Sequence, residues 1–120
     1  MASLNSVSLI GNLGGNPESR ILPSGDQVVT FSIATSEAYT DKNAQKVEIT
    51  DWHRIELWGG LADVALKYLQ KGDMVYIEGK LRNERYTDKE GIERSTYKIR
   101  ANNMQILKSK HDKVWANRRK

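Results

Sequence analysis

Alternating apolar and polar side chains predict five long β-strands along this chain. Successive side chains of a strand point to opposite faces of a sheet, so one face of each segment can line a core. The predicted strands are residues 5–13, 27–39, 50–58, 74–86 and 93–107. Turn residues or polar stretches separate several of them, at residues 23–26 (PSGD), 40–46 (TDKNAQK) and 87–91 (TDKEG). The chain is therefore predicted to be mostly β.

The apolar period changes between the third and fourth predicted strands. There, apolar residues recur at helical spacing, at Leu61, Val64, Ala65, Tyr68 and Leu69. This predicts a short amphipathic helix over residues 60–70, with Lys71 in its last turn and Gly72 as its C-terminal stop. Five strands with one helix between the third and fourth indicate an all-β, five-stranded OB-fold Greek-key barrel. A β-sandwich is the alternative, although a lone helix is harder to place in it.

The length of 120 residues fits one domain, which the strand pattern places at residues 1–107. Residues 108–120 have few apolar side chains and are predicted to form a disordered basic tail or the start of a linker. The net charge is +4, but residues 1–107 hold 13 Lys and Arg against 14 Asp and Glu, whereas the tail holds six against one. Net charge therefore does not identify a nucleic-acid binder, and basic residues of the domain would have to gather on one face.

Cysteine usage and the absence of long apolar runs bear on location. The chain has no cysteine, which fits a reducing compartment. Its first residues lack a basic start followed by a long apolar run, and no apolar run approaches the roughly 20 residues of a membrane helix. We therefore expect a soluble, cytoplasmic protein.

The third predicted strand concentrates large aromatic and charged residues. One of its faces holds Trp52, Arg54, Glu56 and Trp58, and the other holds Asp51, His53, Ile55 and Leu57. Ile55 and Leu57 are expected in the core. The two tryptophans are either buried, as large aromatic residues often are, or form a surface on which flat groups stack.

Two further aromatic residues, Tyr39 and Tyr86, lie where predicted strands meet polar loops, so burial is least expected there. Proteins that bind single-stranded nucleic acid without sequence preference combine aromatic platforms with a basic track. Candidate phosphate-binding residues are Arg20, Lys42, Arg54, Lys80, Arg82 and Arg85, with Lys98 and Arg100 as further candidates. Glu56 and Glu84 lie among them and would partly neutralise the track.

With these residues in view, the chain resembles the bacterial single-stranded DNA-binding proteins over residues 4–107. The matching segments occur in order and with the family's spacing: VSLIGNLGGNPE, FSIATSEAYTDK, TDWHRIELWGGLADVALKYLQKGDMVYIEGKLR and RYTDKEG. The resemblance implies an OB-fold protein that binds single-stranded DNA with little sequence preference and protects it during replication, recombination and repair. It also implies base stacking at Tyr39, Trp52, Trp58 and Tyr86, where two tyrosines replace usual tryptophans and Trp58 replaces a usual phenylalanine.

The same resemblance implies a nucleoid-associated homotetramer without a cofactor. Subunit contacts are expected from His53, Tyr76, Glu78 and Gln105, with a purely structural role as the alternative for His53. Members of the family normally continue into a linker and an acidic, hydrophobic tip that recruits replication and repair proteins. The sequence in hand ends in basic residues, so such partners are expected only if an acidic tip follows Lys120.

Two other functions fit parts of the sequence. Catalysis has little support, because no HExxH, P-loop or paired-carboxylate pattern occurs and no serine is placed to form a triad with Asp51 and His53. A primosomal replication protein N, which is a short dimeric OB-fold factor without an acidic tip, is the second alternative. The four aromatic positions and the VYIEGKLR segment argue against it. We therefore expect a binding protein with no catalytic residues and no metal site.

Overall fold

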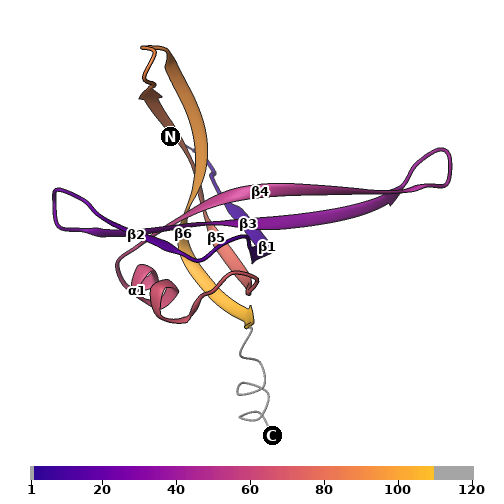
Figure 1. The fold of residues 1–120 in the computed structure, drawn as a ribbon, viewed down its shortest axis with the longest axis horizontal. Helices are drawn as coiled ribbons and strands as arrows, with labels where there is room; N and C mark the ends of the chain where they lie inside the picture. Colours follow the sequence, from indigo (N-terminus) through magenta and orange to yellow (C-terminus); the bar gives the residue numbers. More distant parts are fainter. Residues whose placement is uncertain (1, 110–120) are drawn as a thin grey trace, which may run out of the picture.

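The computed structural model describes residues 2–109, which form six β-strands and one α-helix (Figure 1). The strands are β1 (Val7–Leu13), β2 (Glu18–Ile21), β3 (Gln27–Thr40), β4 (Lys46–Trp58), β5 (Met74–Thr87) and β6 (Glu93–Lys108), and the helix is α1 (Gly59–Tyr68). The five predicted strands are present as β1, β3, β4, β5 and β6. Most of the predicted basic tail, from residue 110 onward, lies outside the described residues.

Five of the strands close into a barrel. β1 pairs antiparallel with β5, and its C-terminal end also pairs with β3, where Leu13 lies opposite Ile33. β3 pairs with β4 and β5 pairs with β6, both antiparallel, while β4 and β6 run parallel where Ile55 lies beside Ile99. The resulting order β1-β3-β4-β6-β5 returns to β1 and closes the ring. This is the predicted OB-fold barrel, with its helix between the third and fourth barrel strands.

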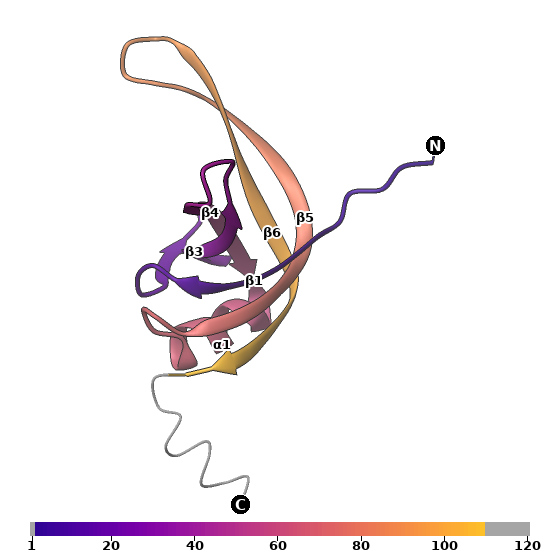
Figure 2. The same cartoon turned by 90° about the vertical axis from the view of Figure 1, so that its right-hand side faces the viewer.

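The barrel interior is filled by alternate residues of the long strands, as the apolar pattern predicts. Its fully buried side chains include Ile33, Ile55, Leu57, Val75 and Ile77. α1 packs against this core through Ala62 and Ala65, both of which are fully buried. In Figure 2 the helix lies at one end of the barrel, away from the β5–β6 hairpin. Among the described residues, no helix is long and apolar enough to span a membrane.

The helix ends earlier than predicted. Leu69 has an extended backbone, although its N–H still donates a hydrogen bond to the Ala65 carbonyl, so the last helical residue is Tyr68. Lys71 and Gly72 therefore belong to the following turn, where Gly72 has a φ of +93°. The prediction that they complete the helix was wrong, because Leu69 turns into the core and directs the chain towards β5.

Two further differences concern the strands. β2 was not predicted, because all four of its residues are exposed and carry no apolar alternation; it forms by pairing with the edge of β3. β4 begins at Lys46 rather than at residue 50, because β3 and β4 stay paired up to Thr40 and Lys46. The polar loop is therefore only residues 41–45.

The β3–β4 and β5–β6 hairpins extend beyond the barrel as two arms (Figures 1 and 2). Both tips are entered through the same sequence, Tyr-Thr-Asp-Lys, at residues 39–42 and 86–89. In each tip the aspartate Oδ1 accepts hydrogen bonds of 2.9 Å from the backbone N–H groups two and four residues later, at Asp41 and at Asp88. The residue three positions after the aspartate has a positive φ in both, +59° at Ala44 and +80° at Gly91. The two arms thus end in the same loop structure.

Candidate nucleic-acid interface

The strand register places the predicted aromatic and basic residues of β4 on one outward surface, called here the outer face. It is formed by Trp52, Arg54, Glu56 and Trp58 together with their cross-strand neighbours. On one side, Trp58 lies opposite Val28, which lies opposite Arg20 of β2. On the other side, Glu56 lies beside Arg100 of β6. Cross-strand partners share a face of the sheet, so the outer face continues across several strands.

The outer face gathers basic side chains from four strands. Across β6 and β5, Arg100 is opposite Lys80, and Lys98 is opposite Arg82. The basic residues brought together are Arg20, Arg54, Lys80, Arg82, Lys98 and Arg100. Lys42 lies instead in the loop of the β3–β4 arm, and Arg85 is on the opposite side of β5 from Arg82. The domain therefore carries a local basic surface although its charges nearly balance.

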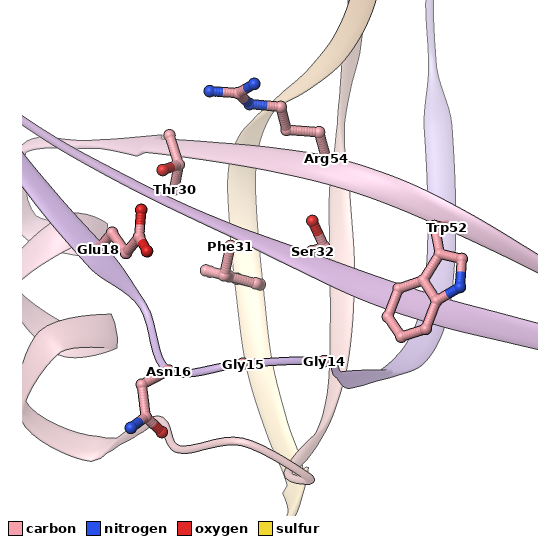
Figure 3. A pocket seen from close by; sticks show the side chains of 9 residues that line it. All are labelled: Gly14, Gly15, Asn16, Glu18, Thr30, Phe31, Ser32, Trp52 and Arg54. Carbon is pink, nitrogen blue, oxygen red and sulfur yellow. The ribbon is translucent and has the colours of Figure 1, made fainter.

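Trp52 is held out in solvent, with 63% of its surface exposed. The ring lies against the backbone of Gly14, where a Cβ atom would be 2.8 Å from Trp52 Cη2 and closer still to Cζ3. Figure 3 shows the ring beside the chain from Gly14 to Asn16, at one end of an open hollow. The hollow has a volume of about 430 Å³, and Ser32 and Arg54 also line it. The exposed face of this indole is thus available to a flat ligand.

Trp58 is in a different environment, because it is half-buried and bonded on its edge. Its Nε1 donates a hydrogen bond of 2.7 Å to Oε1 of Glu56. The guanidinium carbon of Arg100 lies 4.5 Å from the centroid of the ring. The prediction of a surface role thus fits Trp52 directly, whereas the ring of Trp58 is covered by a cation.

Glu56 is buried, with 4% exposure, and does not act as a free negative charge on the outer face. Its Oε2 accepts a hydrogen bond of 2.6 Å from Nζ of Lys98, which also lies 3.3 Å from Glu84. Burial alone would raise the pKa of Glu56, but the hydrogen bonds from Lys98 and Trp58 and the charges of Lys98 and Arg100 outweigh it and lower that pKa. The expected partial neutralisation of the basic track is seen here, because Lys98 is paired with both Glu56 and Glu84.

The two tyrosines lie near the tips of the arms, as predicted, and about half of each side chain is exposed (52% for Tyr39, 50% for Tyr86). Tyr86 is on the same side of β5 as Arg82, opposite Arg94 of β6. Tyr39 is opposite Val47. It comes five residues after Ala34, the partner of Trp52, and side chains an odd number of residues apart point to opposite sides of a strand, so Tyr39 is on the other side of the hairpin from Trp52. The structure therefore brings Trp52 and Trp58 onto one face and places Tyr86 on the same side of β5 as the outer-face residue Arg82, whereas Tyr39 points to the other side of the β3–β4 arm.

The expected subunit-contact residues fall into two places. Tyr76, Glu78 and Gln105 lie on the outward side of β5 and β6, nearer the helix end of the barrel. The Tyr76 hydroxyl donates a hydrogen bond of 2.5 Å to Glu78, whose carboxylate raises the pKa of Tyr76. His53 is on the side of β4 opposite to Trp52, where its Nε2 is 2.8 Å from Oγ1 of Thr35. This bond connects β4 to β3 within the subunit, and the subunit contact of His53 stays a prediction.

Sequence reasoning missed two features of this surface. The contact of Trp52 with Gly14 depends on a loop nearly 40 residues away, and no local pattern indicates it. The hydrogen bond of Trp58 to Glu56 had a usable signal, because the two residues are neighbours on one strand face and tryptophan has an N–H donor. Within residues 2–109, no three His, Cys, Asp or Glu side chains are grouped as metal ligands.

With this geometry established, the chain can be compared with known proteins. The model of the Single-strand binding protein family matches residues 4–107. The chain belongs to this family. Curated relatives include a single-stranded DNA-binding protein of Neisseria meningitidis serogroup A, 48% identical over 110 residues, and single-stranded DNA-binding protein 1 of Xylella fastidiosa, 47% identical over 113 residues. These alignments cover 92% and 93% of this chain, and 63% and 83% of the relatives, respectively.

Solved structures of family members have the same fold. A Plasmodium falciparum SSB in complex with ssDNA superposes with a TM-score of 0.82 at 34% identity, covering 89% of this chain and 97% of that one. A deletion mutant of the single-stranded DNA binding protein from Thermus aquaticus gives 0.77 at 32% identity, covering 89% of this chain and 52% of that one. These matches confirm the predicted OB-fold and the predicted family.

Proposed function

We propose that this chain binds single-stranded DNA with little sequence preference and protects it during replication, recombination and repair. The observation that carries the proposal is the Trp52 ring, held 63% exposed beside Arg54 on a surface where basic residues gather. An exposed indole next to a guanidinium suits a nucleotide, whose base is flat and whose phosphate is negative. Family membership and the named relatives support the same function.

The proposed mechanism is passive. Bases of the bound strand stack on Tyr39, Trp52 and Tyr86 and over the Trp58 ring that Arg100 covers, and phosphates contact Arg20, Lys42, Arg54, Lys80, Arg82 and Arg85. Single strands are preferred because a duplex hides the faces of its bases in its own stack. Sequence preference is weak because every base has a π-face. Basic residues that neutralise phosphates release counterions, so affinity falls as salt rises. The mechanism includes no catalytic step.

The proposal includes assembly into a homotetramer in the cytoplasm, at the nucleoid. Tyr76, Glu78 and Gln105 would contribute to subunit contacts, and the neighbouring Ile10 supports this because it is 56% exposed and lies opposite Tyr76. A partner subunit would cover such an apolar side chain. His53 would act from within the subunit by fixing β4 to β3. Replication and repair proteins would be partners only through an acidic tip beyond Lys120.

Titration with poly(dT) tests the proposed binding. Tryptophan emission should be quenched as DNA is added, and the affinity should fall steeply between low and high salt. A duplex of the same length is the control and should bind much more weakly. Absence of quenching, together with tight duplex binding, would overturn the proposal.

The mass of the chain in solution tests the proposed assembly. A tetramer supports it, whereas a stable dimer favours the accessory-factor alternative. The substitution Ile10→Lys is a sharper probe, because it places a charge in the proposed contact without touching the outer face. It should lower the mass of the assembly, and an unchanged mass would place the contact elsewhere.

A further inference from the structure

Arg100 and Trp58 form a preassembled stack on the outer face. The guanidinium carbon lies 4.5 Å from the centroid of the indole ring, within the range of a cation–π contact. Arg100 is exposed whereas Trp58 is half-buried, so the guanidinium that covers the ring is itself accessible to solvent. A base arriving at this point meets Arg100 first.

The ring beneath Arg100 is fixed on its edge. Trp58 Nε1 donates to Glu56, and Glu56 is itself held by Lys98 at 2.6 Å. Rotation of the indole would break its bond to a buried carboxylate. A phenylalanine at this position would have no N–H group and could not make that bond. Trp58 therefore acts as a rigid support in this chain.

The outward side of Arg100 remains open to a ligand. Among residues 2–109, no carboxylate forms an ion pair with its guanidinium, whereas Lys98 is paired with both Glu56 and Glu84. A guanidinium is planar, delocalised and weakly hydrated, and its plane stacks on nucleobases as well as on aromatic side chains. One side of Arg100 is thus occupied by Trp58 and the other is suited to a base.

We propose that Arg100 is a base-stacking residue, so that one nucleobase of the bound strand completes a Trp58–Arg100–base stack. The proposal rests on the proposed function and concerns how the strand is bound at this position. Direct stacking of a base on Trp58 would require Arg100 to leave a ring that it already contacts, and would forfeit the cation–π contact. Glu56 is the positioning residue, because it holds the indole in the plane on which Arg100 rests.

The substitution Arg100→Lys tests this role, because lysine keeps the positive charge but has no planar group. Its matched control is Arg82→Lys, the same change on the neighbouring strand, where no aromatic ring supports the arginine among the described residues. Both variants of the full chain are titrated with a short oligo(dT) and with an oligomer of equal length that consists of abasic deoxyribose phosphates. Thermal unfolding and solution mass confirm that each variant folds and assembles as the parent does.

Arg100→Lys should weaken oligo(dT) binding about fivefold or more, the loss expected for one stacked base. Its binding to the abasic oligomer and the slope of log affinity against log salt should match the parent. Arg82→Lys, a change at a proposed phosphate contact, should alter the affinities for the two oligomers by the same factor. The inference fails if Arg100→Lys binds oligo(dT) as the parent does, or loses equally on both oligomers, because Arg100 would then contact phosphate only. Failure of the parent itself to bind oligo(dT) would instead overturn the proposed function.

Discussion

The contact between Trp52 and Gly14 makes Gly14→Ala a direct test of how the exposed ring is positioned. A methyl group at Gly14 would lie 2.8 Å from Cη2 of the indole and closer still to Cζ3. Carbon atoms in favourable contact are about 3.5–4.0 Å apart, so the ring must move by about 1 Å. The backbone at Gly14 does not have a positive φ, so alanine introduces no strain of its own.

The effects of Gly14→Ala on stability and on DNA affinity depend on where the displaced Trp52 ring moves. Because Trp52 is 63% exposed, the ring moves into solvent rather than into the core, and the free energy of unfolding should change by less than about 1 kcal/mol. Misplacing one stacking platform should cost up to the value of one stacked base, about 1–3 kcal/mol. Affinity for single-stranded DNA should therefore fall by about 5- to 150-fold while the fold is retained.

Gly15→Ala is the matched control, since a Cβ at that position meets no atom within 4 Å. The two variants are compared by the anisotropy of a labelled oligo(dT) and by urea unfolding. Gly14→Ala should lose affinity and keep its stability, and Gly15→Ala should keep both. Equal affinity of the two variants would show that the position of the ring does not matter for binding. A large loss of stability in Gly14→Ala would show that Trp52 belongs to the packing of the barrel.

Three further predictions concern single groups. Because the pKa of Glu56 is lower in the folded chain than its ordinary value of 4.5, the ionised carboxylate stabilises the fold above pH 4.5. This stabilisation should be lost as the pH falls through the lower pKa of the folded state, and urea unfolding across this pH range measures the loss. Trp58→Phe removes the donor to Glu56 and should lower the free energy of unfolding by about 1 kcal/mol, measured at neutral pH. Ala44→Gly should raise stability by about 0.5–1 kcal/mol, because alanine at a φ of +59° is strained, and thermal unfolding would show it.

Each of these predictions has a control within the chain. Glu56→Gln should flatten the acid dependence attributed to that residue, and an unchanged pH profile would assign the effect to other carboxylates. Trp58→Phe should cost less in the Glu56→Gln background, since the donor then serves an uncharged acceptor; equal costs would mean the hydrogen bond contributes little. Gly91→Ala creates in the second arm the strain that Ala44→Gly removes from the first, so a neutral result for both would contradict the strain argument.

The alternation of side chains was sufficient to predict the barrel strands and the division of β4 into two faces. It was sufficient because the buried Ile55 and Leu57 alternate with Arg54, Glu56 and Trp58, which point to the outer face. It could not distinguish the environments of Trp52 and Trp58, which share a face in the sequence pattern. That difference depends on Gly14 and Arg100, which other parts of the chain bring to the two rings.

Elements without an apolar pattern were the ones missed or misplaced. β2 has no buried residue and exists only because β3 offers it an edge to pair with. The extension of β4 to Lys46 is a property of the hairpin, since both sides of that arm are largely exposed and periodicity carries little information there. The end of the helix was set by the burial of Leu69, which helical spacing alone could not separate from continued helix.

Because the two arms end in the same loop structure, the length of an arm and the side to which its tyrosine points can be changed separately. Each loop is closed by its own aspartate, so paired residues can be removed from an arm without altering its tip. Removing one cross-strand pair, such as Ala38 and Glu48, would turn Tyr39 to the other side of the β3–β4 hairpin. Removing two successive pairs would restore the original side and draw the tyrosine about 7 Å towards the barrel. Whether an arm has an odd or an even number of residue pairs thus sets the side to which its tyrosine points. The total number of pairs sets the distance of the tyrosine from the barrel.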